Sequence, residues 1–178
     1  MIIAREKKKS NVAEYILYMW QVEDMIRACS FDIEEIEKNI ISRMKMDKLL
    51  HEETRIWYTD LVDKMKKEEI EKSGHLAFVI DTLDQLETFH HKLLNELKNE
   101  KYINLYKLAG PNINALREKG KSPEKGDIYV SLTGLYGLLV LRLRKKVVSG
   151  ETAMALQTIS NLVAFLSAQY MKRQYPGK

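Results

Sequence analysis

The residues whose types and spacing could most readily do chemistry near the N-terminus are Glu23 and Arg27, in the stretch AEYILYMWQVEDMIRA. At about 100° per residue, Glu23 projects between Val12 and Ile16, within the apolar face of a helix. Because burial of an unpaired charge costs several kcal/mol or more, a carboxylate there needs a partner. Arg27, one turn later, has the required spacing and sign. We therefore predict a partly buried Glu23–Arg27 ion pair that fixes how this helix docks.

The same side chains also allow a functional interpretation. Together with Tyr15 and Trp20, Glu23 and Arg27 could form the rim of a polar pocket. The helix is apolar over so much of its circumference that one side is also a candidate for contact with a second subunit. We favour the structural ion pair and keep the polar pocket as the alternative.

A second candidate set is the sequence ETFHH, which places Glu87 three residues before His90 and next to His91. A Glu-x-x-His on an inward-facing helix resembles half of the di-metal motif of ferritin-like bundles. That motif needs a second copy, and neither His51 nor His75 has a glutamate three residues before it. We therefore favour His90 as a hydrogen-bonded core residue. A single-metal site that uses His90, His91 or His75 with a carboxylate such as Glu87 is the alternative.

Complete catalytic sets are missing from the sequence. Cys29 has no histidine near it, and no serine stands in a glycine-rich elbow. The segment from Gly120 to Gly126 lacks the glycine-lysine-serine ending of a phosphate-binding loop. We therefore expect no cofactor and favour a non-enzymatic protein.

Composition narrows the location of the protein. The 178 residues carry a modest net charge of +4. They include one cysteine, so the composition gives no sign of a disulfide-forming compartment. The opening MIIAREKKKS lacks the order of a secretory signal, and the apolar run from Ile128 to Leu141 is shorter than the roughly 20 residues of a membrane span. We expect a cytoplasmic protein without a membrane segment.

Two short basic clusters, Arg5 to Lys9 and Arg142 to Lys146, are the least balanced parts of the charge pattern. Runs of this length are typical of solvated surfaces and of helix C-termini, where cations complement the helix dipole. Nucleic-acid binding domains usually gather more positive charge on one face. Nucleic-acid binding is therefore a minor alternative.

Helical spacing throughout predicts an all-α, single-domain bundle of about seven helices over residues 1–178, with the last two long helices central. A basic N-terminal segment spans 1–10, and the charged, glycine-containing and proline-containing stretch 119–127 is a surface loop. The expected helices run over residues 11–29, 32–45, 47–74, 75–98, 100–118 with a break at Gly110-Pro111, 127–146 and 149–173.

Local signals place several of these boundaries. Asp32, Asp47, Asp127 and Ser149 are expected to cap the N-termini of their helices, and Gly74 to end the third helix as a left-handed C-cap. In the last two helices, small residues predict close, antiparallel packing across a short turn: Gly134, Gly137, Ser160, Ala164, Ser167 and Ala168.

The whole chain, and most specifically MIIAREKKKSNVAEYILYMWQVEDMIRA with FDIEEIEKNI and LYGLLVLRL, resembles an uncharacterised family of small all-helical bacterial proteins known only as a domain of unknown function. The resemblance implies a helical domain from a bacterial cytoplasm. It implies no reaction, ligand or catalytic residue.

Taken together, these observations favour a non-enzymatic helical protein that acts through protein–protein contacts, as a homodimer or with another protein partner. A metal-binding or small-molecule enzyme built around Glu87, His90 and His91 is the first alternative, and nucleic-acid binding through the basic clusters is the second.

Overall fold

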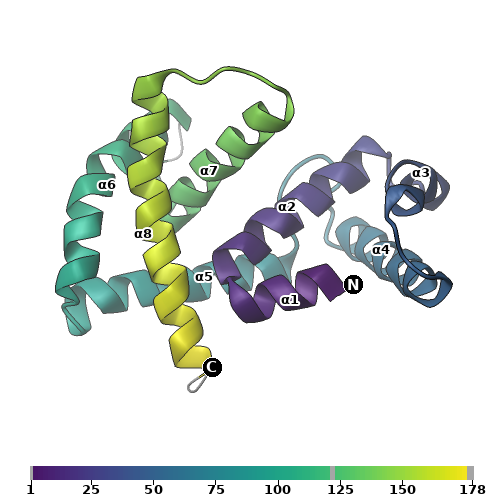
Figure 1. Ribbon diagram of the computed structural model, residues 1–178, viewed down its shortest axis with the longest axis horizontal. Helices are drawn as coiled ribbons and strands as arrows, with labels where there is room; N and C mark the ends of the chain where they lie inside the picture. The colour runs from purple at the N-terminus through teal and green to yellow at the C-terminus, as the bar shows by residue number, and fades with distance from the viewer. Residues whose placement is uncertain (1, 121–122, 176–178) are drawn as a thin grey trace. The chain divides into compact units, whose positions relative to one another are not determined.

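A computed structural model describes residues 2–120 and 123–175 of the chain. These residues form eight α-helices, a 3₁₀ turn at Ile41–Arg43 and a π-helical turn at Lys92–Glu96, and they contain no β-strand (Figure 1). The predicted all-α fold class is confirmed, with one helix more than expected. None of the described helices is both long enough and apolar enough to cross a bilayer.

The helices form two compact units. The first comprises residues 2–9 and 14–81, and the second residues 10–13, 82–120 and 123–175. The bounds of the helices are α1 Ile2–Ser10, α2 Val12–Ala28, α3 Ile33–Asn39, α4 Lys48–Lys67, α5 Ala77–His91, α6 Glu100–Gly120, α7 Asp127–Leu143 and α8 Gly150–Gln174.

The first unit begins with the predicted basic segment, which folds as helix α1. Lys7 forms an ion pair with Glu14 across the junction with α2, and the ammonium of Lys8 lies over the ring of Tyr15. Asp32 accepts hydrogen bonds from the first amides of α3, and Asp47 accepts one from the amide of Leu50 in α4. Both predicted N-caps are therefore confirmed.

Helix α2 is enclosed over most of its circumference by the chain itself. Eight of its apolar side chains are no more than 5% exposed: Val12, Ala13, Tyr15, Ile16, Met19, Trp20, Val22 and Ile26. The broad apolar side that suggested a second subunit is therefore already covered within one chain.

Helix α4 ends at Lys67 and does not extend to Gly74. Glu69 adopts a left-handed conformation with φ of 56°, and the amide of Ile70 donates to the carbonyl of Met65, which completes a C-cap before the glycine is reached. Gly74 does have the predicted positive φ, at 102°, but it lies in the loop that leads to α5. The prediction of the helix end was wrong because a glutamate serves as the left-handed residue.

In the second unit, α6 continues through Gly110 and Pro111 without the predicted break. Proline removes one helical hydrogen bond, here the bond to the carbonyl of Lys107. Pro111 and Lys107 both lie on the exposed side of α6, where water can bond to that carbonyl. The helix therefore tolerates the proline and extends to Gly120. Of the loop predicted over 119–127, positions 121 and 122 lie outside the described residues.

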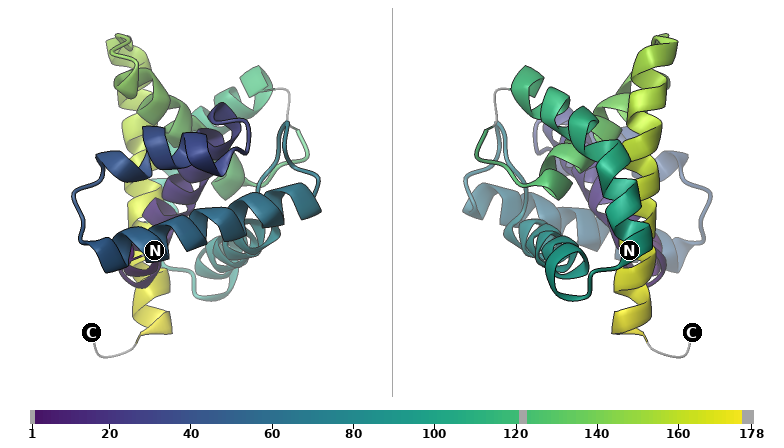
Figure 2. Two further views of the ribbon diagram at one scale, coloured as in Figure 1. Left: turned by 90° about the vertical axis from the view of Figure 1, so that its right-hand side faces the viewer. Right: turned by 90° about the vertical axis from the view of Figure 1, so that its left-hand side faces the viewer.

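Helix α8 packs along α6 and α7, and its contact with α6 is the more extensive (Figure 2). Ser149 caps its N-terminus by accepting a hydrogen bond from the amide of Thr152, as predicted. At Gly134 a Cβ atom would lie 2.6 Å from Leu116 of α6 and 3.3 Å from Leu156 of α8, so that glycine does permit close packing. At Gly137 nothing lies within 4 Å, and the predicted tight contact is absent there.

Candidate functional site

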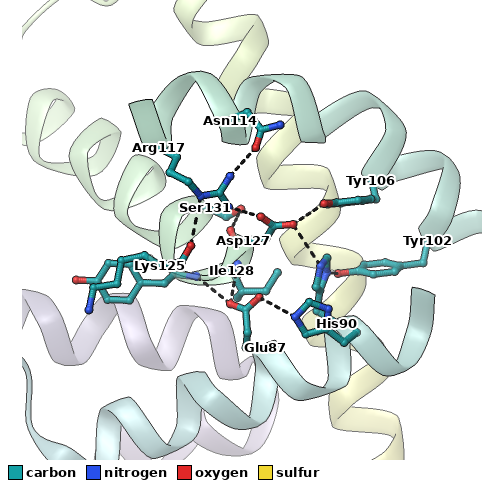
Figure 3. Close-up of polar contacts among 12 residues, drawn as sticks. Glu87, His90, Tyr102, Tyr106, Asn114, Arg117, Lys125, Asp127, Ile128 and Ser131 are labelled. Atoms are coloured by element: carbon teal, nitrogen blue, oxygen red, sulfur yellow. Dashed lines mark hydrogen bonds and ion pairs between the residues drawn. The ribbon is translucent and has the colours of Figure 1, made fainter. Parts of the chain in front are cut away.

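The Glu-x-x-His of α5 does not aim both side chains at one point. Glu87 reaches the N-terminus of α7, where its Oε2 accepts hydrogen bonds from the amides of Ile128 at 2.9 Å and Tyr129 at 3.4 Å (Figure 3). Its other oxygen lies 3.7 Å from Nε2 of His91. Glu87 therefore acts as the N-cap of a helix that is distant from it in sequence.

This arrangement replaces the cap that the sequence predicted. The N-cap position of α7 is Gly126, and Asp127 is the first residue of the helix and not its cap. A Cβ at Gly126 would lie only 2.4 Å from the carboxylate of Glu87, so the glycine leaves room for that carboxylate against the helix end. Glu87 takes over the capping, and the side chain of Asp127 is free to bond elsewhere.

His90 is a fully buried core residue, as favoured from the sequence. Its Nδ1 lies 2.6 Å from the hydroxyl of Tyr102 on α6, and its Nε2 lies 3.6 Å from Oδ2 of Asp127 on α7. Nδ1 and the Tyr102 hydroxyl share a hydrogen bond, and Nε2 faces the carboxylate of Asp127. His90 thus joins α5, α6 and α7.

Asp127 is the centre of this network, as Figure 3 shows. The hydroxyl of Tyr106 donates to Oδ2 over 2.5 Å, and the guanidinium of Arg117 donates to Oδ1. The pKa of Asp127 lies well below its usual range, because His90 most strongly, and then Tyr106 and Arg117, favour the charged carboxylate over the opposing effect of burial. The network is therefore anchored on an ionised aspartate.

The network holds helices together and offers little to a substrate. An aspartate that orients a histidine can serve acid–base catalysis, but the third member here is Tyr102, whose side chain is fully buried. Burial raises the pKa of Tyr102, and it raises the pKa of Tyr106 to about 12, with a further contribution from the hydrogen bond to Asp127. Within the described residues, no three histidine, cysteine, aspartate or glutamate side chains are grouped so that they could hold a metal ion.

In the first unit, Glu23 is fully buried, but its partner is not Arg27. Nδ1 of His75 donates to Oε2 of Glu23 over 2.6 Å, and the amide of Leu76 donates to Oε1 over 3.0 Å. The predicted Glu23–Arg27 pair was therefore wrong. The loop before α5 supplies a backbone amide and an imidazole that approach the carboxylate directly.

Arg27 binds the other end of the same loop. Its guanidinium pairs with Asp24 at 3.0 Å and donates to the carbonyls of Ile70 at 3.1 Å and Gly74 at 2.5 Å. These carbonyls follow the C-cap of α4, where backbone acceptors lack helical partners. Glu23 thus accepts hydrogen bonds from this loop, and Arg27 donates hydrogen bonds to its carbonyls.

The two aromatic residues predicted beside Glu23 do lie near it. Trp20 stacks on the imidazole of His75 with ring centroids 4.4 Å apart and an angle of 16° between the rings. Burial raises the pKa of Tyr15, and the charge of Glu23 raises it further. The sequence therefore predicted that Tyr15, Trp20 and Glu23 lie together, but it did not predict that His75 pairs with Glu23.

A surface that sequence reasoning missed lies at the end of α7. In the described structure, every α7 residue from Thr133 to Leu143 keeps some exposure, although most of them are apolar. The exposure continues at Leu143 (61%) and Val147 (98%), and at Met154 (69%) in the second turn of α8. We call residues 135–147 with Met154 the α7–α8 tip. The signal available in the sequence was the apolar run of this helix, which was expected to lie at the centre of the bundle.

The fold and these contacts define an all-helical protein in which buried carboxylates and histidines tie helices and loops to one another. A family model described as a domain of unknown function, DUF4924, matches residues 1–176, and the chain belongs to this family. The resemblance to a family known only as a domain of unknown function is thereby confirmed. No curated protein and no solved structure matched the chain.

Proposed function

We propose that this is a non-enzymatic cytoplasmic protein that acts through protein–protein contacts, and that the α7–α8 tip is its contact surface. The observation that carries the proposal is the uncovered C-terminal half of α7. Half a helix whose apolar residues all remain partly exposed is unusual in a soluble domain, and continuous exposed apolar surface is typical of interaction sites.

The charges of the tip indicate what kind of partner it fits. Arg142, Arg144, Lys145 and Lys146 are all exposed and follow directly on the apolar run. No ion pair involves any of them within the described part of the chain. A partner with apolar side chains and surrounding carboxylates would complement both features.

A different protein fits this surface better than a second copy of the chain. In a two-fold symmetric dimer built on the tip, the same patch of both copies would meet, which brings the four cations of one copy towards the four of the other. Like charges across an interface oppose association. A homodimer formed through the tip is therefore the less favoured form of the proposal.

A protein partner also accounts for the tip better than a nucleic acid does. Phosphate contacts use cations, but they gain nothing from exposed leucine, valine and methionine side chains such as Leu143, Val147 and Met154. The cytoplasmic location rests on Cys29, since a lone cysteine gives no intramolecular disulfide.

The experiment compares proteins captured from a lysate of the source cells by three immobilised forms of the full chain. These are the wild type, the tip variant Leu143→Ser/Val147→Ser/Met154→Ser, and the control variant Leu49→Ser/Ile56→Ser, which removes apolar side chains of comparable exposure from α4. We expect a partner that the wild type and the control retain and that the tip variant loses at least fivefold. The purified partner should then bind with the same ranking.

A capture profile that is identical for the wild type and the tip variant would overturn the proposal. Light scattering at micromolar concentration tests whether the chain forms a homodimer, and we expect the mass of a monomer. If the wild type were a dimer and the tip variant a monomer, the partner at the tip would be a second copy of the chain and not another protein.

A further inference from the structure

A cavity of about 390 Å³ lies between the C-terminal part of α6, the middle of α7 and the start of α8. Its walls are mainly apolar, and include Leu116, Val130, Leu138 and Leu156. The volume falls within the range of roughly 300 to 1,000 Å³ that is usual for small-molecule sites. The cavity has the size and the lining of a site for an apolar molecule.

Two glycines of α7 line this cavity in different ways. Gly134 is in close contact with its neighbours, because a Cβ there would meet Leu116 at 2.6 Å. A Cβ at Gly137 would meet nothing within 4 Å, although this glycine also lines the cavity. A glycine in the middle of a helix costs stability relative to alanine. At Gly137 the missing side chain therefore leaves space in the cavity without serving helix packing.

Among its described lining residues, the cavity has one cation without an ion-pair partner. Arg117 and Lys119 both line it, but the guanidinium of Arg117 is bonded to Asp127 and Asn114. Lys119 is exposed and makes no ion pair with any described residue. The described lining residues of this cavity include no carboxylate, while Glu151 lines a smaller neighbouring cavity between α6 and α8. Lys119 is thus placed to meet an anionic group at the rim.

We propose that the cavity between α6, α7 and α8 binds a small organic carboxylate with an apolar chain, of the fatty-acid class, with the chain beside Gly137 and the carboxylate at Lys119. The apolar walls bury the chain, and Lys119 supplies the charge complementarity. This inference concerns a small molecule and not the protein partner, although Gly137 and Leu138 belong both to the tip and to the cavity wall.

Isothermal titration of the full chain with decanoate, below its micelle concentration, tests the proposal. We expect saturable binding near one molecule per chain, and weaker binding of decanol and of decylammonium. The absence of saturable decanoate binding up to millimolar concentration would overturn the proposal, and so would equal binding of decanoate and decanol.

Matched variants locate the site. Gly137→Leu should fill the cavity and reduce decanoate affinity at least tenfold, while Gly110→Leu should leave the affinity unchanged, because Gly110 is also a helical glycine with nothing within 4 Å of its Cβ but lies outside the cavity. Both should raise the melting temperature, since leucine is the better helix former. Lys119→Gln should weaken decanoate binding about threefold and leave decanol binding unchanged. Wild-type affinity in Gly137→Leu would contradict the assignment.

Methyl NMR spectra of the wild type provide a test that does not depend on the folding of a variant. Decanoate should shift the methyl signals of Leu116, Leu138 and Leu156 with one common saturation curve, and leave that of Leu61 in α4 unchanged. Unshifted Leu116 and Leu156 signals at saturating decanoate would show that the ligand binds elsewhere and would overturn the proposal.

Discussion

Glu23 on α2 and His75 in the loop before α5 are joined by a hydrogen bond of 2.6 Å between His75 Nδ1 and Glu23 Oε2, although 52 residues separate them in sequence. The second oxygen of Glu23 accepts the amide of Leu76, a residue that is fully buried. The carboxylate therefore fixes the loop to α2 through one side chain and one backbone donor.

Replacement of Glu23 should be costly because it leaves the buried amide of Leu76 without an acceptor. We expect Glu23→Ala to lower the free energy of unfolding by about 1 to 3 kcal/mol, the usual cost of an unsatisfied buried group. Glu23→Gln keeps an acceptor oxygen and should cost less. Urea unfolding of the three proteins measures both effects. Equal midpoints for the wild type and Glu23→Ala would show that the loop does not depend on this carboxylate.

Asp127 predicts a pH dependence with a definite sign. Its pKa is lowered in the folded chain, so its contribution to stability is complete above about pH 4, the ordinary pKa of aspartate, and is lost as the pH falls towards the folded-state pKa. Asp127→Asn should therefore be less stable than the wild type at pH 7, by about 1 to 3 kcal/mol for the loss of charged hydrogen bonds. The difference should shrink below about pH 4.

Asp63→Asn is the matched control for that experiment, because Asp63 is exposed and its replacement removes the same charge. Urea midpoints across the pH range should be nearly the same for this control and the wild type. A stability difference between Asp127→Asn and the wild type that stays constant down to pH 2 would contradict the proposed ionised network.

The sequence predicted the caps and the cluster members better than the pairings. Asp32, Asp47 and Ser149 cap their helices as expected because an N-cap is a local contact within three residues. Asp127 was wrongly predicted as a cap, and the capping role of Glu87 was missed, because their partners lie on other helices and helical projection shows only which face a residue occupies. The helical periodicity of a sequence predicts which side chains are buried, whereas the hydrogen-bond partner of each side chain depends on tertiary packing.

The apolar run of α7 shows the same limitation. Leu132 is fully buried, but Leu143 on the same helical face is 61% exposed. A helical projection shows which side of a helix is apolar and does not show where the covering helix ends. The sequence therefore could not reveal the tip.

Gly126 and Glu87 should be energetically coupled. A methyl group at Gly126 would displace the Glu87 carboxylate from the N-terminus of α7, so Gly126→Ala should cost about 1 kcal/mol, the usual value of a helix cap. In a Glu87→Ala background the same substitution should cost much less. A double-mutant cycle from urea unfolding measures the coupling. Strict additivity of the two substitutions would mean that the glycine does not serve the cap.

Glu69 offers a stabilising substitution. Its φ of 56° is unfavourable for a side chain with a Cβ, and glycine at this C-cap position removes that cost. Glu69→Gly should therefore raise the free energy of unfolding by about 1 kcal/mol. Glu71→Gly, also in this loop but without a positive φ, should be neutral or destabilising. If Glu71→Gly had the higher free energy of unfolding of the two variants, the described end of α4 would be contradicted.

The most direct test of the contact role of the tip is photo-crosslinking in living cells. A photoreactive amino acid at Val147, which is 98% exposed, is compared with the same amino acid at Ile56 on α4, which is 63% exposed. We predict one discrete crosslinked product to another protein at Val147, lost when Arg142, Arg144, Lys145 and Lys146 are changed to glutamate, and none at Ile56. Equal, diffuse crosslinking at both positions would contradict the account.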